Sequence, residues 1–374
     1  MKFNKIIINN VRNIEQAILY PSSKFNFIFG PNGSGKTSIL ESLYYFGHAR
    51  SFRSHIANRM IRQEQNMMTL FSELISSDEL SITVGIQRDM AQNCKIHIQK
   101  QAAKNTAELA TLLPIILINP DSFNLLSGGS KPRRALIDWG LFHVEHRYHS
   151  LWLKLQRCLK QRNMALKQRL PFEQISIWDE EFCVIAEEVD FARKHYCEQL
   201  YPKFKTIIDE VLPNNQVEYH YSRGWSKDKE LKALLTDSYH QDTERGYSFY
   251  GPQRADLVLK TGSLPLLDFL SRGQQKAVVC ALHIAQAELL HEQAKKESIF
   301  LLDDLPSELG MQYRNYLINS LNRLNAQVYL TSIEKEGLYE ALVDKTVKMF
   351  HVEQGVLKEV DSTYIPKILQ NANF

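Results

Sequence analysis

Two short runs of mostly apolar residues open the chain. Residues 6–8 are three isoleucines, and residues 25–29 read Phe-Asn-Phe-Ile-Phe. Both patterns predict β-strands. The second run ends at a glycine-rich segment, after which residues 38–46 carry apolar side chains at helical spacing. The N-terminal pattern therefore predicts a strand, a loop and a helix in direct succession.

More strands are expected up to residue 118. Residues 80–84 and 95–98 alternate and are separated by turn residues, which predicts an antiparallel meander. Residues 115–118 are fully apolar and are followed by Asn-Pro-Asp, so they predict a short buried strand that ends in a turn. The first third of the chain is therefore expected to be rich in β-structure.

Residues 130–212 have helical periodicity and few strand signals. Pro171 separates two apolar faces, which predicts an antiparallel pair of helices. The side chains expected on these faces are Trp152, Leu155, Leu159 and Met164, and then Trp178, Phe182, Ile185, Val189 and Ala192.

Strand character returns after the helical block. It is expected at residues 217–221 and 298–302, and residues 347–360 predict a hairpin that turns at Gln354-Gly355. The whole order favours one nucleotide-binding domain interrupted by a helical insertion over two domains in series.

Composition narrows the class of protein. The chain has 374 residues, which is long for one compact domain, and its 44% hydrophobic and 23% charged residues are ordinary for a globular protein. No apolar run is long enough to span a membrane, and the N-terminus lacks a signal-peptide layout. Five scattered cysteines without a C-x-x-C pair argue against a zinc site or disulfides. We therefore expect a cytoplasmic protein without a membrane partner.

A complete phosphate-loop pattern, G-x-x-x-x-G-K-T, follows the strand at 25–29. In such loops the glycines let main-chain N–H groups face phosphates, the lysine reaches the β- and γ-phosphates, and the hydroxyl ligates Mg²⁺. A chance glycine turn is the alternative, but the preceding strand and following helix favour a site for ATP with Mg²⁺. The expected binding residues are Gly30, Pro31, Asn32, Gly33, Ser34, Gly35, Lys36 and Thr37.

Two carboxylates end the apolar strand at 299–302. In phosphate-loop proteins the first such carboxylate serves the Mg²⁺ ion, so Asp303 is a candidate metal residue beside Thr37. Asp304 is placed to orient the attacking water, which makes Asp303, Asp304 and Lys36 the candidate catalytic residues. A buried strand followed by a polar turn is the alternative, and the phosphate loop upstream argues against it.

A third motif, Leu-Ser-Arg-Gly-Gln-Gln-Lys at 270–276, precedes a helical run. It resembles the LSGGQ signature of ABC-type ATPases, where the serine and glycine at a helix N-terminus contact the γ-phosphate held by the other subunit. Ser271, Gly273 and Gln274 are then further nucleotide-binding candidates. Ser271 as a simple helix cap is the other interpretation, and both can hold.

The three motifs, in this order, resemble the ABC-type ATPases of DNA metabolism and, among them, the RecF family of bacterial recombination mediators. The resemblance covers the whole chain. Stretches that carry it, besides the three motifs, are residues 25–27, 47–54, 132–134, 136–140 and 250–257, with Asp303-Asp304-Leu305 and Ser307-Glu308-Leu309.

The resemblance implies an α/β fold: an ABC-type ATPase head with a mixed sheet and an antiparallel meander, interrupted by a mostly helical arm. We expect residues 1–120 and 246–374 to form the head and residues 121–245 the insertion. It further implies an ATP-dependent homodimer, double-stranded DNA near single-strand junctions, a RecR partner and help in loading RecA.

Three positions bear on the rate of hydrolysis and on dimer coupling. Gly310 stands where the family has an aspartate that helps to join the two sites, and Thr331 stands where ABC transporters place a switch histidine. Asp304 is one methylene shorter than the transporters' glutamate. The differences at 304 and 331 predict slow hydrolysis, suited to a switch, with a turnover below about 10 per second. The glycine at 310 bears instead on how tightly the two sites are coupled.

Candidate DNA contacts follow from a local basic excess, because the net charge of the chain is only +3. Residues 131–169 contain ten basic side chains and only Asp138 and Glu145 as acidic ones, and Lys154, Arg157 and Arg162 can share a helix face. A solvated helix surface is the alternative. The candidates are Lys131, Arg133, Arg134, Lys154 and Arg157, with Arg50 and Arg53 after the phosphate-loop helix as a second group.

Two other functions share some of these motifs. The ATPase subunit of a membrane transporter has all three nucleotide motifs, but a basic helical insertion and a threonine at 331 are not expected there. A small-molecule kinase uses a phosphate loop, but the motif at 270–276 has no role in it. An ATP-gated DNA-binding protein fits the sequence best.

Overall fold

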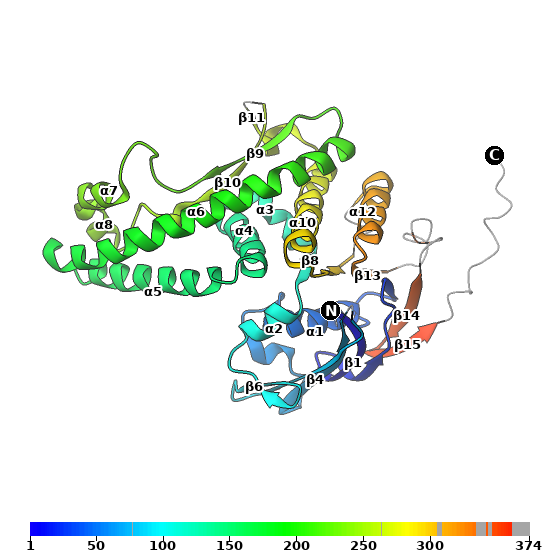
Figure 1. The fold of residues 1–374 in the computed structure, drawn as a ribbon. Helices are drawn as coiled ribbons and strands as arrows, with labels where there is room; N and C mark the ends of the chain where they lie inside the picture. Colours follow the sequence, from blue (N-terminus) through cyan, green and yellow to red (C-terminus); the bar gives the residue numbers. More distant parts are fainter. Residues whose placement is uncertain (77, 263, 305–308, 334–341, 343–345, 361–374) are drawn as a thin grey trace. The chain divides into compact units, whose positions relative to one another are not determined.

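The computed structural model describes residues 1–76, 78–262, 264–304, 309–333, 342 and 346–360. The chain divides into two compact units: residues 1–122 with 295–374, and residues 123–294. Each unit is coloured by sequence in Figure 1. Of the stretch at 303–309, Leu305, Ser307 and Glu308 lie outside the described residues. The head and insertion boundaries given above stay a prediction.

The first unit contains a mixed sheet that carries the phosphate loop. Its order is β15-β14-β3-β13-β12-β8, and all neighbours pair in parallel except β14 with β15. All residues of β3, β12 and β13 are buried, as expected for central parallel strands. The bounds are β3 (Phe25–Phe29), β8 (Ile115–Ile118), β12 (Ile299–Leu302), β13 (Gln327–Ser332), β14 (Val347–Glu353) and β15 (Val356–Val360).

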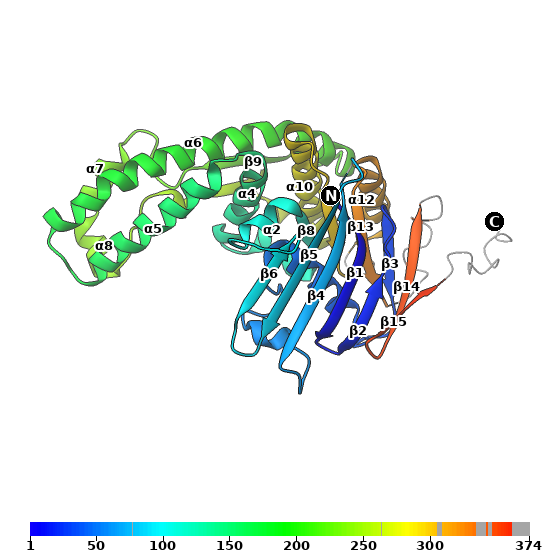
Figure 2. The same ribbon diagram turned by 60° about the horizontal axis from the view of Figure 1, so that its bottom comes forward.

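An antiparallel sheet completes the first unit, in the order β2-β1-β4-β5-β6-β7 (Figure 2). One hydrophobic core joins both sheets to helix α1, with Ile8 and Leu70 from the antiparallel sheet, Leu43 from α1, and Ile115 and Tyr329 from the mixed sheet. The strands are β1 (Lys2–Val11), β2 (Ile14–Leu19), β4 (Met67–Ile75), β5 (Ser81–Asp89), β6 (Cys94–Ile98) and β7 (Gln101–Ala102), and the helices are α1 (Lys36–His48), α2 (Ala107–Leu112) and α12 (Met311–Arg323).

The second unit is mostly helical and contains one small sheet, β11-β10-β9. Helices α5 and α6 pack along one another (Figure 1), which confirms the predicted pair. Its helices are α3 (Asn124–Ser127), α4 (Ser130–Val144), α5 (Tyr148–Lys167), α6 (Phe172–Val211), α7 (Leu231–Asp237), α8 (Tyr239–Arg245), α9 (Leu266–Phe269) and α10 (Arg272–Ala294), and its strands are β9 (Val217–Ser222), β10 (Asp256–Thr261) and β11 (Leu264–Pro265).

The apolar faces predicted for α5 and α6 are buried or half-buried except at one position, and one residue of the predicted basic face of α5 is buried. Leu155, Phe182 and Val189 are buried, but Met164 is 51% exposed. Arg162, which was expected to share the basic face of α5, is fully buried because two aspartates pair with it. The drift of a straight helix relative to a flat core explains why the ends of such a face are the least predictable.

The predicted α/β fold with a mixed sheet, an antiparallel meander and a helical segment is confirmed. None of the described helices is both long and apolar enough to cross a membrane.

Candidate functional site

The phosphate loop connects the end of β3 to the start of α1. Gly30 has φ +151° and Gly35 has φ +121°, both in the region that favours glycine. A Cβ atom on Gly30 would lie 2.1 Å from the carbonyl oxygen of Val352, so no larger residue fits there without moving β14. The backbone shape expected from the motif is therefore present.

Lys36 points back into the loop. Its Nζ donates hydrogen bonds to the carbonyl oxygens of Gly30, at 2.7 Å, and Pro31, at 2.9 Å. Burial lowers the pKa of Lys36, while Asp304 and Asp303 nearby act in the opposite direction. The buried Oγ of Ser34 has no hydrogen-bond partner among the described residues. The loop thus holds a cation and a spare hydroxyl that suit an anionic ligand.

Asp303, Thr37 and Thr331 converge at the ends of neighbouring strands and the start of α1. The hydroxyls of Thr37 and Thr331 both donate to Oδ1 of Asp303, at 3.2 and 2.7 Å. Burial raises the pKa of Asp303, and the two hydroxyl hydrogen bonds oppose this shift. A hydroxyl and a carboxylate in contact are the oxygen ligands that Mg²⁺ takes in addition to phosphates and water.

Asp304 follows in a left-handed conformation, with φ +52°, which Asp tolerates better than most residues. Its N–H donates to Oγ1 of Thr331 at 2.9 Å. Thr331 therefore links the two carboxylate residues: it accepts from the main chain of Asp304 and donates to the side chain of Asp303. The sequence indicated only that Thr331 lacks the imidazole of a switch histidine. This bridging role could not be predicted from the sequence.

Asn13, in the turn between β1 and β2, is a residue that motif reasoning missed. Its Nδ2 donates to the carbonyl oxygens of Gly33, at 3.2 Å, and Ser34, at 3.0 Å, and its Oδ1 accepts from Ser38 Oγ at 3.1 Å. From the opposite end of the chain, the N–H of Gly355 donates to Ser34 O at 2.7 Å. Two hairpins thus brace the loop, and no local sequence signal points to their contacts with it.

Glu41 is the second missed residue. It lies on α1 with a fully buried side chain, and Arg12 makes two hydrogen bonds to it, at 2.9 and 2.7 Å. The hydroxyl of Ser51 also donates to Glu41, and Arg53 approaches to 3.8 Å. This network ties residues 51–53 to the phosphate-loop helix.

The two candidate DNA-binding residues of the first unit, Arg50 and Arg53, lie in the segment that follows α1. Arg53 pairs with Glu41 yet its side chain remains 47% exposed. Arg50 is exposed and lies near Tyr44, whose ring stacks on His48 at 3.9 Å. Their proposed contact with DNA is compatible with this placement, and stays a prediction.

The signature segment, in the second unit, forms a reciprocal cap at the N-terminus of α10. Ser271 N–H donates to Gln274 Oε1 at 2.9 Å, and Gln274 N–H donates to Ser271 Oγ at 3.3 Å. This is a capping box with glutamine in the third position. Ser271 is exposed and Gly273 half-buried, so the cap and a role toward a ligand are compatible.

The basic candidates of the second unit fall into two groups. Arg133 forms a bidentate salt bridge with Asp256, with N–O distances of 2.7 and 3.0 Å, and Arg134 donates a hydrogen bond to the carbonyl oxygen of Ala255. These two arginines join α4 to the segment at β10. Lys131, Lys154 and Arg157 are exposed to solvent.

Known proteins resemble this chain along almost its whole length. The sequence model described as the RecF/RecN/SMC N terminal domain matches residues 2–358. The DNA replication and repair protein RecF of Shewanella pealeana is 44% identical over 355 residues, which are 95% of this chain and 98% of that protein. The RecF protein of Shewanella woodyi is 42% identical over 361 residues, which are 96% and 99% of the two chains.

Solved structures show the same fold. One described as the recombination mediator protein RecF-ATP in the RecFOR pathway has a TM-score of 0.85 at 21% identity, covering 96% of this chain and 98% of that one. An Smc head bound to the C-winged helix domain of ScpA has a TM-score of 0.62 at 13% identity, covering 96% and 97%.

Proposed function

This chain belongs to the RecF family of DNA replication and repair proteins, and from that premise we propose that it is an ATP-gated, DNA-binding switch of replication and recombinational repair. The observation that supports this best is the convergence of Thr37 and Asp303, 3.2 Å apart, beside the phosphate loop. A solved RecF described as ATP-bound shares the fold. The transporter alternative has no such support, since the two relatives described above are RecF proteins that match over nearly their full length.

ATP is the ligand we propose for the loop. The main-chain N–H groups of residues 30–37 would face its phosphates, and Lys36 would exchange the carbonyl oxygens of Gly30 and Pro31 for phosphate oxygens. Thr37 and Asp303 would hold Mg²⁺, which when bound supplies positive charge against the phosphates. The spare hydroxyl of Ser34 and the glycine backbone fit such an anion.

Hydrolysis is proposed to be slow. Asp304 would orient the attacking water, and its backbone is held by Thr331. A threonine hydroxyl cannot exchange protons at neutral pH as a histidine does. Asp303 must be ionised to serve the metal, although its burial favours the protonated form. These features suit slow ATP hydrolysis that ends the ATP-bound state of the switch.

A second copy of the chain is proposed to complete each nucleotide site. Ser271, Gly273 and Gln274 at the N-terminus of α10 would contribute N–H groups and the positive helix end to the γ-phosphate bound by the partner copy. Gly310 is the N-cap residue of α12. The family has an aspartate at this position, and we propose that the glycine weakens coupling between the two sites.

Double-stranded DNA beside a single-strand gap is the proposed nucleic acid. The exposed Lys131, Lys154 and Arg157 of the second unit, with Arg50 and Arg53 of the first, would contact phosphates without reading sequence. We further propose RecR as a protein partner and RecA loading as the outcome, because one solved structural neighbour is described as belonging to the RecFOR pathway.

Sedimentation velocity with and without ATP and Mg²⁺ tests the switch. The wild-type chain is expected to dimerise only with ATP, and Lys36→Met and Ser271→Arg to stay monomeric. Lys95→Met, an exposed lysine of β6, is the matched control and is expected to dimerise as the wild type does. A wild-type chain that is monomeric in every condition would remove the in-trans mechanism.

A further inference from the structure

An apolar stripe runs along the solvent side of α6. Ile177, Val184 and Phe191 are 71%, 58% and 73% exposed, and the first and last are the most exposed large apolar side chains among the described residues. They are seven residues apart, so they fall within about 40° of one another around the helix. Single exposed apolar residues are ordinary, but a repeated line of them marks an interaction surface.

Glutamates border this line on both sides. Glu180 and Glu187 lie on one flank, and Glu181 and Glu188 lie on the other, each three or four residues after an apolar position. All four are exposed, and residues 172–192 contain no lysine or arginine. We call these seven residues the α6 stripe: Ile177, Glu180, Glu181, Val184, Glu187, Glu188 and Phe191.

The neighbouring helix has the opposite charge. Residues 148–170 contain Lys154, Arg157, Lys160, Arg162, Lys167 and Arg169 and no acidic residue. The α5–α6 hairpin is therefore basic on one helix and acidic on the other. DNA, attracted to α5, is repelled by the α6 stripe, and so is an anionic membrane surface.

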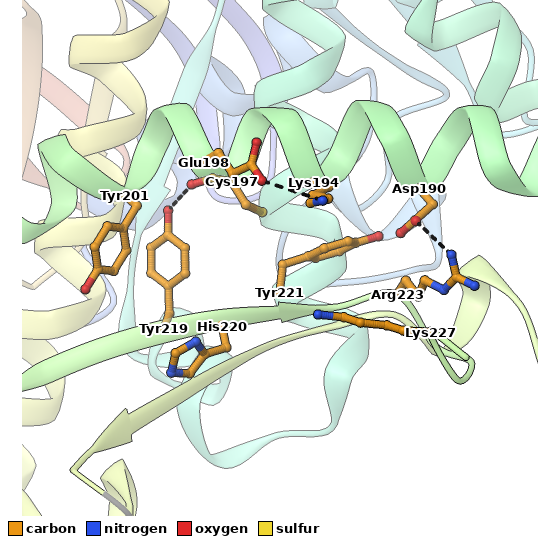
Figure 3. Close-up of a pocket in the computed structure, with 10 residues that line it drawn as sticks. All are labelled: Asp190, Lys194, Cys197, Glu198, Tyr201, Tyr219, His220, Tyr221, Arg223 and Lys227. Atoms are coloured by element: carbon orange, nitrogen blue, oxygen red, sulfur yellow. Dashed lines mark hydrogen bonds and ion pairs between the residues drawn. The ribbon is translucent and has the colours of Figure 1, made fainter. Parts of the chain in front are cut away.

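The other sides of α6 are already packed. One side lies on α5, and another faces β9 across a hollow of about 550 Å³. In Figure 3, Tyr219 OH donates to the carbonyl oxygen of Cys197 at 2.7 Å, and Arg223 lies 3.8 Å from Asp190. Arg223 and Lys232 reach the stripe only at its edge, 3.5 Å from Glu187 and 3.9 Å from Glu180.

A second hollow adjoins the end of the stripe. It has a volume of about 760 Å³ and lies between α6 and the α4–α5 corner. Leu141, Val144 and Leu151 form its apolar wall, while Phe191 and Glu188 stand at the stripe side. In protein interfaces, a few anchoring side chains that fill such pockets contribute most of the binding energy. This hollow can receive one anchoring side chain of a partner.

We propose that the α6 stripe and this hollow dock an amphipathic helix of a protein partner that carries lysine or arginine beside its apolar residues. The seven-residue repeat fits a helix, because two helices meet along such a repeat. The acidic flanks select a basic partner and exclude acidic ones. The site is distinct from the proposed nucleotide and DNA sites and requires neither ligand.

A second copy of the chain fits the stripe less well. Among the described helices of twenty residues or more, only α5 is oppositely charged, and its exposed apolar residues Leu153 and Met164 are eleven positions apart. That spacing does not match a repeat of seven. The same face of α5 carries Arg157, which we assign to DNA.

Fluorescence anisotropy on the full-length chain tests the proposal. The probe is a labelled 21-residue peptide of three identical heptads, with leucine at two positions of each heptad and lysine beside them; its control is a scrambled peptide of equal composition. The wild-type chain is expected to bind the heptad peptide at least tenfold more tightly than the scrambled one. Phe191→Ser is expected to weaken binding about tenfold, which corresponds to about 1.4 kcal/mol.

Matched substitutions separate the surface from general effects. Leu80→Ser, at a 65% exposed leucine of the first unit, is expected to leave binding unchanged. Glu181→Gln combined with Glu188→Gln is expected to weaken binding at low salt and to have little effect at high salt. Equal binding of both peptides, no binding, or equal losses in Leu80→Ser and Phe191→Ser would each overturn the proposal. So would a nucleotide-free wild-type dimer that Phe191→Ser converts to monomers, because the occupant would then be a second copy.

Discussion

Arg162 allows a quantitative test of the second unit. Its Nε lies 2.6 Å from Asp179, and its Nη1 lies 3.1 Å from Asp242 and 2.7 Å from Ser248 Oγ. The side chains of the arginine and both aspartates are at most 3% exposed. One buried guanidinium therefore neutralises one of two buried carboxylates and provides hydrogen bonds to both.

Arg162→Met keeps most of the side-chain volume but leaves both aspartates buried without their cation. Removing one partner of a buried ion pair costs about 3–5 kcal/mol, since the remaining charge has lost its water and its partner. With a urea dependence of about 3 kcal/mol per molar, the unfolding midpoint is expected to fall by about 1–2 M. Arg157→Met, five residues earlier on the same helix and exposed, is expected to change stability by less than about 0.5 kcal/mol.

Tryptophan fluorescence makes this measurement specific. All four tryptophans, Trp139, Trp152, Trp178 and Trp225, lie in the second unit, so their emission follows the unfolding of that unit even where the first unfolds separately. If Arg162→Met shifts the midpoint no more than Arg157→Met does, the assignment of Arg162 as a structural cation is refuted. Conversely, Arg157→Met alone is expected to lower DNA affinity.

Three further predictions concern the two ligands and pH. Lys154→Glu with Arg157→Glu is expected to weaken duplex DNA binding and to reduce the slope of log affinity against log salt by about 1–2, measured by anisotropy, with Lys95→Glu as the control; an unchanged slope would place DNA elsewhere. Thr331→Val removes the hydrogen bonds to Asp303 and Asp304 while keeping the shape, so ATP hydrolysis is expected to fall about tenfold or more with ATP binding retained, by phosphate release and filter binding. Burial raises the pKa of Asp303, so its charge destabilises the nucleotide-free fold at neutral pH, and this cost disappears as pH falls through the raised pKa. Asp303→Asn is therefore expected to stabilise the nucleotide-free chain at pH 7, with a benefit that shrinks toward pH 4, and to abolish Mg²⁺-dependent dimerisation; urea unfolding at both pH values and sedimentation check this, and a destabilised variant at pH 7 would contradict it.

Local patterns were sufficient for many of the elements and for recognising the three nucleotide motifs. The strand at 25–29, its loop and α1 follow from period and glycine spacing, and Asp303 follows from a strand that ends in carboxylates. The residues of each signal lie within a few positions of one another, and therefore each signal can be recognised in the sequence alone.

Contacts between distant segments were beyond such reasoning. Asn13 and Gly355 reach the phosphate loop from hairpins about 20 and 320 residues away along the chain, and only the sheet pairing brings them there. Helix periodicity placed Arg162 near a basic face, but whether a residue at the edge of that face turns inward depends on the aspartates of α6 and α8. Periodicity predicts the direction in which a side chain points from its helix. It does not predict which residues of other helices face that side chain.

The close approach of Gly30 and Val352 affects when, during synthesis, the phosphate loop gains its full support. The loop at residues 30–35 leaves the ribosome early, yet the strand that passes it and the N–H of Gly355 that binds Ser34 are synthesised some 320 residues later. A nascent chain that lacks β14 and β15 has the whole nucleotide motif but neither of these supports. We therefore expect ATP binding to become possible only near the end of translation, after the helical second unit has been synthesised.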